Sequence, residues 1–284
     1  MTIAIIGATG QLGGHAINAL LDRNVAPGDI LALGRDSDRL AELAGRGLRT
    51  ATVDLDDITA TTATLTGIES LLLISVGGPG QGLEPRRNAV TAARTAGVRH
   101  LVYTSALHAP TTTLVLAAEH KATEDVITSS GIPATFLRNG WYTENHEADF
   151  RAAQQRGVIA NSVGTGRIAT ATRADYAEAA AVVLTTPGHQ GKVYELSGDT
   201  AWNFTDFAAT ASDVLGSPVR YEALSPADEQ EQLRNAGLDD ATIGFMSILN
   251  ANIAADSLAD TTGDLAGLIG HPTQPLADTM RTWL

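Results

Sequence analysis

The sequence predicts an open, doubly wound α/β sheet of parallel strands, followed by a smaller C-terminal lobe. Short apolar runs alternate with longer amphipathic segments through the first half of the chain. These runs are apolar on both faces, as strands buried in a parallel sheet require. The length of 284 residues and the apolar content of 44% are enough for a large core.

Six apolar runs are expected to form strands joined by right-handed helical crossovers. They are Ile3–Ile6, Ile30–Leu33, Thr50–Val53, Ser70–Ser75, His100–Thr104 and Ala134–Leu137. Between them, helical periodicity occurs near residues 12–22, 37–46, 58–65, 85–96 and 115–130. Later segments predict a helix at 147–156, a strand and then a helix N-capped by Asp175 within 167–184, and a strand at 192–198.

A glycine-rich turn follows the first strand directly. Its sequence, GATGQLGG, has the spacing G-x-x-G-x-x-G and opens a helix. Glycines at such a turn let backbone amides approach a pyrophosphate at the positive end of the helix dipole. We therefore expect a Rossmann-like, dinucleotide-binding fold, although an ordinary turn that needs small residues is the alternative. The expected cofactor contacts are Gly7, Ala8, Thr9, Gly10, Gln11, Leu12 and Gly13.

The ends of the next strands indicate which dinucleotide binds. The second strand ends at Arg35, whose planar guanidinium suits a 2′-phosphate, whereas the NAD fingerprint has an acid there. This favours NADPH, with a solvated surface role for Arg35 as the alternative. Asp36 is either that acid displaced by one residue or the N-cap of the next helix. Asp54 is expected near the adenine, and the middle of the cofactor is expected beside Ile74, Ser75 and Val76.

The domain organisation follows from this pattern. Residues 1–155 are expected to form the dinucleotide-binding domain, and residues 166–199 to return to its sheet. Residues 200–284 are expected to form a smaller lobe that covers the substrate. Open α/β folds bind ligands at the carboxyl ends of their strands, so the lobe should lie there. Helices in the lobe are expected near 204–215 and 226–236, and residues 266–280 should form a short helix, a turn marked by proline and a final helix.

The proton donor of many reductases is missing from the sequence. No tyrosine is followed four residues later by lysine, so the Tyr–Lys pair that protonates an alkoxide is absent. Ketone reduction creates an alkoxide whose conjugate acid, like water, is a very weak acid. Hydride transfer to a quinone creates a phenolate whose conjugate acid has a pKa of roughly 10. The absence therefore suits a quinone reductase, and it equally suits a protein that binds NADPH without catalysis.

Composition bears on partners and location. The net charge is −13, and residues 201–284 hold 12 acidic against 3 basic residues. Such a surface repels nucleic acid and anionic lipid. Because the chain has no cysteine, no signal-peptide pattern and no long apolar stretch, we expect a cytoplasmic protein with no bound metal and no membrane insertion. A homodimer remains open.

Seven motifs spread nearly from end to end carry a family resemblance: GATGQLG, LLLIS, YTSALHA, RNGWYTEN, ATRADYAEAAA, GKVYELSGD and LIGHPT. Together they resemble the type 2 NAD(P)H:quinone oxidoreductases, in the NmrA-like branch of the atypical short-chain dehydrogenases. The resemblance implies a Rossmann domain, NADPH as the donor and a small planar quinone as the acceptor. The alternative from the same branch is a non-catalytic regulator that senses NAD(P).

The resemblance also implies roles for RNGWYTEN, residues 138–145. This segment would surround the nicotinamide, and its aromatic residues would exclude water or face a flat acceptor. Arg173 would also reach the cofactor. The implied contacts are Asn139, Gly140, Trp141, Tyr142, Thr143, Glu144 and Arg173. The alternatives are a core role for the two aromatic residues, which would anchor the lobe, and a surface contact between Arg173 and Asp175.

Three residues are candidates for the chemistry itself. Asn145 would donate a hydrogen bond to the quinone oxygen as charge develops there. Tyr142 would face the acceptor. His120 could relay a proton at neutral pH; it stands in the register where related plant reductases of the wider branch have a catalytic lysine. A structural role is the alternative for His120.

Overall fold

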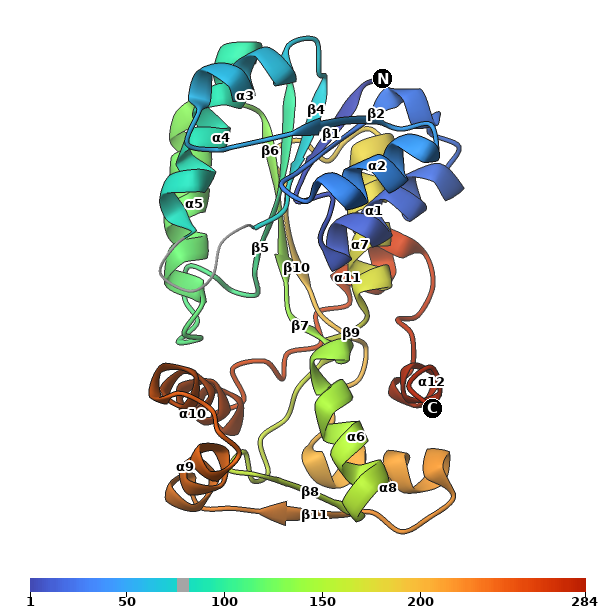
Figure 1. The fold of residues 1–284 in the computed structure, drawn as a ribbon, viewed down its shortest axis with the longest axis vertical. Helices are drawn as coiled ribbons and strands as arrows, with labels where there is room; N and C mark the ends of the chain where they lie inside the picture. Colours follow the sequence, from blue (N-terminus) through green and yellow to red (C-terminus); the bar gives the residue numbers. More distant parts are fainter. Residues whose placement is uncertain (76–81) are drawn as a thin grey trace.

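The computed structural model describes residues 1–75 and 82–284. Its centre is a seven-stranded parallel sheet in the order β10-β6-β5-β4-β1-β2-β3 (Figure 1). The bounds are β1 (Ile3–Ile6), β2 (Ile30–Gly34), β3 (Arg49–Thr52), β4 (Ser70–Leu73), β5 (His100–Ala106), β6 (Ala134–Asn139) and β10 (Val193–Leu196). The predicted doubly wound, Rossmann-like sheet is therefore confirmed.

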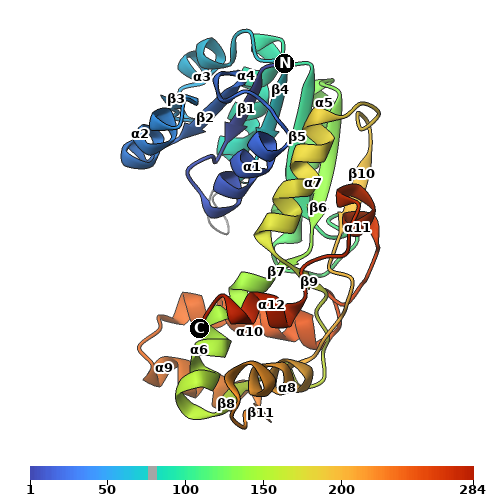
Figure 2. The same ribbon diagram turned by 90° about the vertical axis from the view of Figure 1, so that its right-hand side faces the viewer.

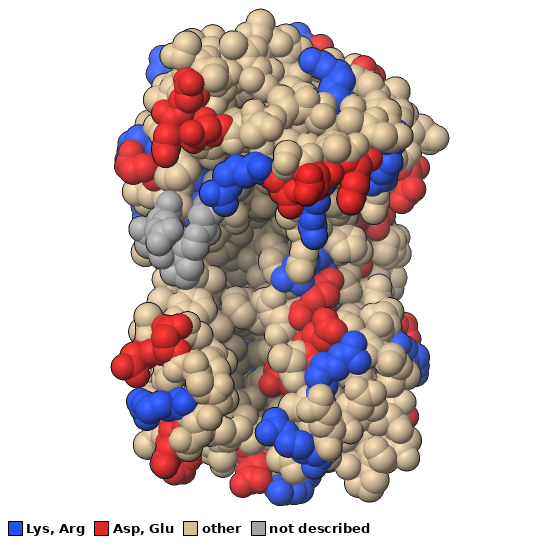
Figure 3. Space-filling model, viewed as in Figure 1, with Lys and Arg blue, Asp and Glu red and all other residues tan. Residues whose placement is uncertain are grey.

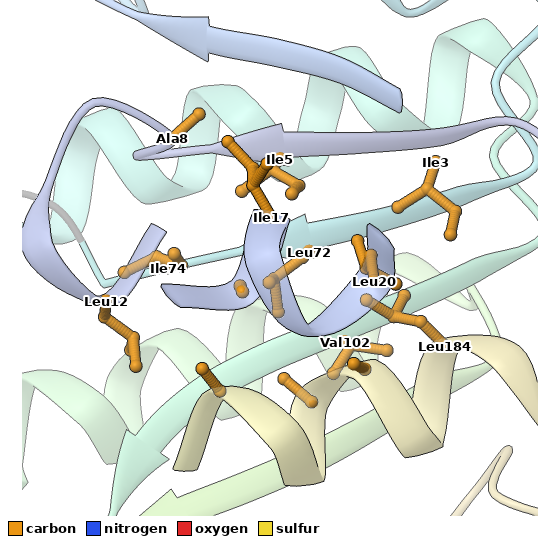
Figure 4. Close-up of a cluster of buried hydrophobic side chains, with 14 of the residues drawn as sticks. Ile3, Ile5, Ala8, Leu12, Ile17, Leu20, Leu72, Ile74, Val102 and Leu184 are labelled. Atoms are coloured by element: carbon orange, nitrogen blue, oxygen red, sulfur yellow. The ribbon is translucent and has the colours of Figure 1, made fainter. Parts of the chain in front are cut away.

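Helices cover both faces of this sheet. One face carries α1 (Gln11–Asp22), α2 (Ser37–Gly45), α7 (Arg173–Thr185) and α11 (Asp264–Ile269). The other carries α3 (Ile58–Leu65), α4 (Leu83–Ala96) and α5 (Ala117–Ser130). Successive strand residues point to opposite faces, so Ile3 and Ile5 pack with Ile17 and Leu20 of α1 (Figure 4). Within the described ranges, no helix is both long and apolar enough to cross a lipid bilayer.

A second body of the chain packs around its own aromatic core. That core includes Phe150, Trp202, Phe207 and Trp283. We call this body the lobe; its elements are α6 (Glu147–Arg156), β8 (Val158–Asn161), α8 (Phe204–Leu215), β11 (Arg220–Ala223), α9 (Pro226–Asn235), α10 (Asp240–Ala254) and α12 (Leu276–Arg281). The lobe lies below the carboxyl ends of the strands, and the molecule is C-shaped from the side (Figure 2).

Short elements lie around the sheet and between the two bodies. They are η1 (Pro27–Asp29), β7 (Trp141–Tyr142), η2 (Thr143–His146) and β9 (Thr170–Ala171). β7 pairs with β9 in parallel, so the chain leaving β6 and the chain entering α7 run side by side. This pairing fixes the segment RNGWYTEN against the start of α7.

Two local predictions are wrong. Helix α7 begins after Thr172, whose side chain accepts a hydrogen bond from the Asp175 N–H; Asp175 is the third helical residue of a capping box, not the N-cap. Residues 147–155 were assigned to the first domain, but α6 packs against β8 and α8, and its Phe150 lies in the lobe core. The remaining domain boundaries stay a prediction.

Candidate active site

The glycine-rich turn between β1 and α1 leaves its backbone uncovered by side chains. Gly7 has φ of +91°, a conformation that other residues rarely adopt. A Cβ at Gly13 would lie 2.2 Å from the Gly7 carbonyl oxygen, which excludes any side chain there. The N-cap residue Gly10 offers no side-chain cap, and the first turn of α1 has no acidic residue. The amides of this turn, at the positive end of the helix, therefore suit a phosphate.

The other residues of the predicted loop divide into buried and accessible ones. Ala8 and Leu12 are buried in the core between α1 and the sheet, whereas Gln11 is exposed at the start of α1. Thr9 packs on Gly34, where a Cβ would lie 2.6 Å from the threonine side chain. This contact brings the end of β2 against the glycine turn.

The end of β2 offers a cation beside this turn. Arg35 is exposed and has no side-chain hydrogen bond or ion pair with any residue in the described part of the chain. Asp36 accepts hydrogen bonds from the N–H groups of Asp38 (3.1 Å) and Arg39 (3.0 Å), which confirms the N-cap interpretation. Arg39, which the sequence analysis missed, donates from Nη1 to the Thr9 carbonyl oxygen at 2.7 Å.

The ends of β3 and β4 lie along the same edge of the sheet. Asp54 is exposed just after β3, and its carboxylate accepts from the N–H of Asp56 at 3.0 Å. The Ile74 N–H donates to the Ile6 carbonyl at 3.1 Å, and the Ser75 N–H donates to Thr104 Oγ1 at 2.9 Å. The backbone after β4 is thereby fixed against β1 and β5. Val76 lies outside the described residues.

Arg138 anchors the end of β6, where RNGWYTEN begins. Its guanidinium donates to both oxygens of Glu124 at 2.9 and 2.7 Å and to Glu195 Oε1 at 2.6 Å. Hydrogen bonds to Glu124, followed by those to Glu195, raise the pKa of Arg138. Glu124 also accepts from the Ser105 hydroxyl at 2.6 Å. A partly buried arginine held by two carboxylates fixes the position of the residues that follow it.

Asn139 presents an unsatisfied acceptor at this point. Its Nδ2 donates to the Tyr142 hydroxyl at 3.4 Å, but its Oδ1 is buried without a hydrogen-bond partner among residues 1–75 and 82–284. A buried acceptor without a donor costs free energy. A ligand amide that reached Oδ1 would remove this cost, so the residue suits a nicotinamide carboxamide.

Gly140 has a packing reason to be glycine. Its N–H donates to the Leu196 carbonyl oxygen at 2.7 Å. A Cβ would lie 3.1 Å from that oxygen and 3.2 Å from the Tyr176 hydroxyl. The Tyr176 hydroxyl is itself buried and lacks a partner within the described chain. The crowding lies between the turn and β10, and the predicted contact of Gly140 with the nicotinamide stays a prediction.

Arg173 contacts the second half of the segment RNGWYTEN. Its Nη2 donates to Asn145 Oδ1 at 2.8 Å, and its backbone N–H donates to Glu144 Oε1 at 2.9 Å. Its guanidinium carbon lies 4.5 Å from the centre of the Tyr142 ring. The alternative contact with Asp175 is wrong, because that buried carboxylate accepts from Thr172 and from the Gln274 N–H.

The aromatic residues of the loop point to different bodies of the protein. Tyr142 meets the Tyr176 ring edge-on, with centroids 5.3 Å apart, and burial raises its pKa, so the hydroxyl stays protonated at neutral pH. Trp141 packs against the lobe core, as its alternative role predicted. Thr143 is buried, and its hydroxyl donates to Thr170 Oγ1 at 3.0 Å.

His120 lies apart from this cluster. It projects from α5 toward Tyr103, whose hydroxyl is 3.0 Å from its Nδ1, and its ring contact is also with Tyr103. Burial, and then the charge of Arg86, lower the pKa of His120 to about 4. Tyr103 faces α4 and α5, whereas Tyr142 packs on the opposite face of the sheet. His120 is therefore neutral at pH 7 and belongs to a separate buried group.

The lobe and the sheet enclose a common space. Figure 3 shows the surface hollowed between the two bodies, with a mostly uncharged floor and with basic and acidic side chains along its rim. The glycine turn and RNGWYTEN both follow carboxyl ends of strands, β1 and β6, which face this space. The arrangement provides a phosphate cradle at one end and an amide and aromatic wall at the other.

Comparison with known proteins agrees with this geometry. A family model described as NAD(P)H-binding matches residues 7–187. The chain belongs to this family. It is 44% identical to quinone oxidoreductase 2 of Escherichia coli K12 over 98% of this chain and 97% of that protein. The resemblance seen in the sequence motifs is therefore confirmed.

Two solved structures of relatives contain a cofactor. The E. coli quinone oxidoreductase QOR2 complexed with NADPH superposes with a TM-score of 0.95, at 44% identity and 99% coverage of both chains. The triphenylmethane reductase of Citrobacter sp. complexed with NADP(H) superposes with a TM-score of 0.94, at 33% identity and 100% coverage of both chains. The backbone of this chain therefore has the same arrangement as the backbones of these two relatives.

Proposed function

We propose that this protein catalyses the NADPH-dependent two-electron reduction of quinones by hydride transfer. One observation carries the proposal: a glycine-rich phosphate cradle lies beside Arg35, which has no side-chain partner among residues 1–75 and 82–284, in a chain 44% identical, over 98% of its length, to a quinone oxidoreductase. The cradle suits a pyrophosphate, and Arg35 suits the 2′-phosphate that distinguishes NADPH from NADH.

The site residues are proposed to bind, orient and exclude water. The amides of residues 10–13 hold the pyrophosphate, and Asn139 Oδ1 accepts from the carboxamide. When bound, the reduced nicotinamide supplies the hydride. Trp141 and Tyr142 wall the acceptor site. Asn145 Oδ1 already accepts from Arg173, which leaves its Nδ2 to donate to the quinone oxygen.

Neither Tyr142 nor His120 is suited to give a proton to the quinone oxygen at neutral pH. The pKa of Tyr142 is raised, and that of His120 is lowered to about 4 in a group on the other face of the sheet. A quinone tolerates this situation, because its reduced oxygen has a conjugate acid with a pKa of roughly 10 and can take its proton from water. The predicted proton relay by His120 is not needed for this chemistry.

An absorbance assay tests the proposal. Protein, NADPH and a simple benzoquinone are mixed, and loss of the reduced cofactor is followed above the uncatalysed rate. Saturable turnover is expected, with NADPH much better than NADH. Tight NADPH binding without turnover across several quinones would instead identify a non-catalytic NAD(P) sensor. The cytoplasmic location, the homodimer and the lack of nucleic-acid partners stay predictions from the sequence.

A further inference from the structure

Helix α10 is unusually apolar for an incompletely buried helix. Residues 241–255 contain no charged side chain, in a chain whose net charge is −13. Only Ile243 and Ile253 of this helix are buried, and Ile248 is 51% exposed, one of few large apolar side chains so exposed in the described chain. Contiguous apolar side chains left open to water often mark a binding surface.

One hydrogen bond fixes which way this face points. Asn252 Oδ1 accepts from the N–H of Val115, in the segment that leaves the carboxyl end of β5. Residues three, four and seven apart share one side of a helix, so Ile248 and Phe245 lie on the same side as Asn252. Together with the half-buried Val115 and Leu116, they form the α10 face.

The α10 face borders the space where the acceptor must bind. α10 lies on the side of the lobe turned toward the sheet (Figures 1 and 2). The segment it contacts continues from β5, whose end lies beside the end of β6 and the loop 139–145. The α10 face therefore lies on the side of the lobe near the end of β5, which neighbours β6 and the proposed quinone site.

We propose that the α10 face binds the apolar side chain of a prenylated quinone while the quinone ring lies at the nicotinamide; this inference rests on the proposed function. The negative charge of the lobe favours an uncharged occupant of this face. Residues 201–284 hold 12 acidic and 3 basic residues, so an anionic membrane surface or a second copy of the lobe would be repelled. A neutral hydrocarbon chain brings no charge and gains free energy in proportion to the apolar area it buries.

Kinetics with a graded series of quinones test this assignment. One benzoquinone ring is used without a side chain and with one or two prenyl units. In the wild type, the first prenyl unit should lower the quinone KM roughly tenfold, as burial of its methyl and methylene groups predicts. In Ile248→Ser and Phe245→Ser this advantage should shrink severalfold. The KM for the ring alone and for NADPH should stay unchanged.

Val193→Ser is the matched control, because Val193 is 44% exposed on the edge strand β10, away from the lobe. It should keep the full effect of the prenyl chain. Equal KM values across the series in the wild type, or the same prenyl advantage in Ile248→Ser, overturn the assignment. Two further outcomes would overturn the assignment. One is a wild-type dimer, seen in sedimentation, that Ile248→Asp dissociates. The other is wild-type binding to phosphatidylglycerol vesicles that Ile248→Asp abolishes. Failure to reduce the bare ring would instead refute the proposed function.

Discussion

The guanidinium of Arg173 lies over the ring of Tyr142, 4.5 Å from its centre, and the same side chain donates to Asn145 at 2.8 Å. Arg173, at the start of α7, thus contacts both Tyr142 and Asn145, the proposed hydrogen-bond donor to the quinone. Asn145 lies 28 positions earlier in the chain. Both contacts depend on the planar, permanently charged guanidinium. The geometry of the site is therefore set jointly by β6 and α7.

Arg173→Ala should loosen this loop. Loss of the contact with the Tyr142 ring and of the hydrogen bond to Asn145 is expected to raise the KM for NADPH about tenfold and to lower kcat. Steady-state kinetics with a simple benzoquinone measure both. Arg151→Ala is the control, since Arg151 is 42% exposed and, among the described residues, pairs with Glu147 alone, on the same helix α6. Equal effects of the two variants would contradict a specific role for Arg173.

Asn145→Ala separates catalysis from cofactor binding. If Asn145 donates to the quinone oxygen, kcat should fall about tenfold to a hundredfold, because hydrogen bonds to developing charge are strengthened in a site that excludes water. The dissociation constant for NADPH, measured by fluorescence titration, should change less than about threefold, which is no more than the loss of a single weak contact would cause. Unchanged turnover would rule out the proposed contact.

Arg35→Ala should change the choice of cofactor. The affinity for NADPH is expected to fall about tenfold or more, as a charge-assisted contact with phosphate is lost, while that for NADH stays nearly constant. Arg46→Ala is a matched control, since Arg46 is also exposed and donates to Asn18 on α1. A parallel loss for both cofactors after Arg35→Ala would remove the 2′-phosphate role.

Two adjacent glycines of α1 should respond oppositely to alanine. A Cβ at Gly13 would lie 2.2 Å from the Gly7 carbonyl, whereas a Cβ at Gly14 would meet nothing within 4 Å. Gly13→Ala is expected to destabilise the fold by about 1–3 kcal/mol and to weaken NADPH binding. Gly14→Ala should stabilise the helix by about 0.5–1 kcal/mol. Denaturant unfolding and NADPH titration of both variants check this, and similar behaviour of the pair would refute the close packing of the turn.

The partly buried His120 should make stability depend on pH. Its pKa is lowered from 6.5 to about 4, so between these values the unfolded chain binds a proton that the folded protein does not. The free energy of unfolding should therefore fall as the pH drops from about 6.5 toward 4, by up to roughly 3 kcal/mol from this residue. His120→Gln should reduce the loss. The wild type and His120→Gln share all other histidines. A difference in their free energies of unfolding that stays constant from pH 7 to 4.5 would therefore contradict this account.

Much of the sheet was predictable because its strands are apolar on both faces. β1, β4 and β5 are buried throughout, and the alternation of such runs with amphipathic helices is typical of few folds. The lobe was harder. β8 and β11 pair across about 60 residues of sequence, and neither run is distinctive in composition. α10 was missed because apolar residues occur around its whole circumference, which removes the helical period that prediction needs.

The cofactor residues were easier to predict than their partners. Glycine spacing directly reflects steric demands, so Gly7 and Gly13 could be inferred from the sequence alone. Contacts that depend on which residues folding brings together could not. The hydrogen bond from Arg39 to Thr9, and the position of Tyr176 beneath Gly140, have no local signature. Two of the candidate catalytic residues were separated only by the structure, which places His120 and Tyr142 on opposite faces of the sheet.

The route of the chain has a consequence for synthesis. The last strand of the parallel sheet, β10, is made only after α6 and β8 of the lobe, and α11 returns from the lobe to pack against α7. Neither body consists of one continuous stretch. A ribosome must therefore release nearly all 284 residues before either core can close, and truncated chains that end between the bodies should yield insoluble fragments instead of half-active domains.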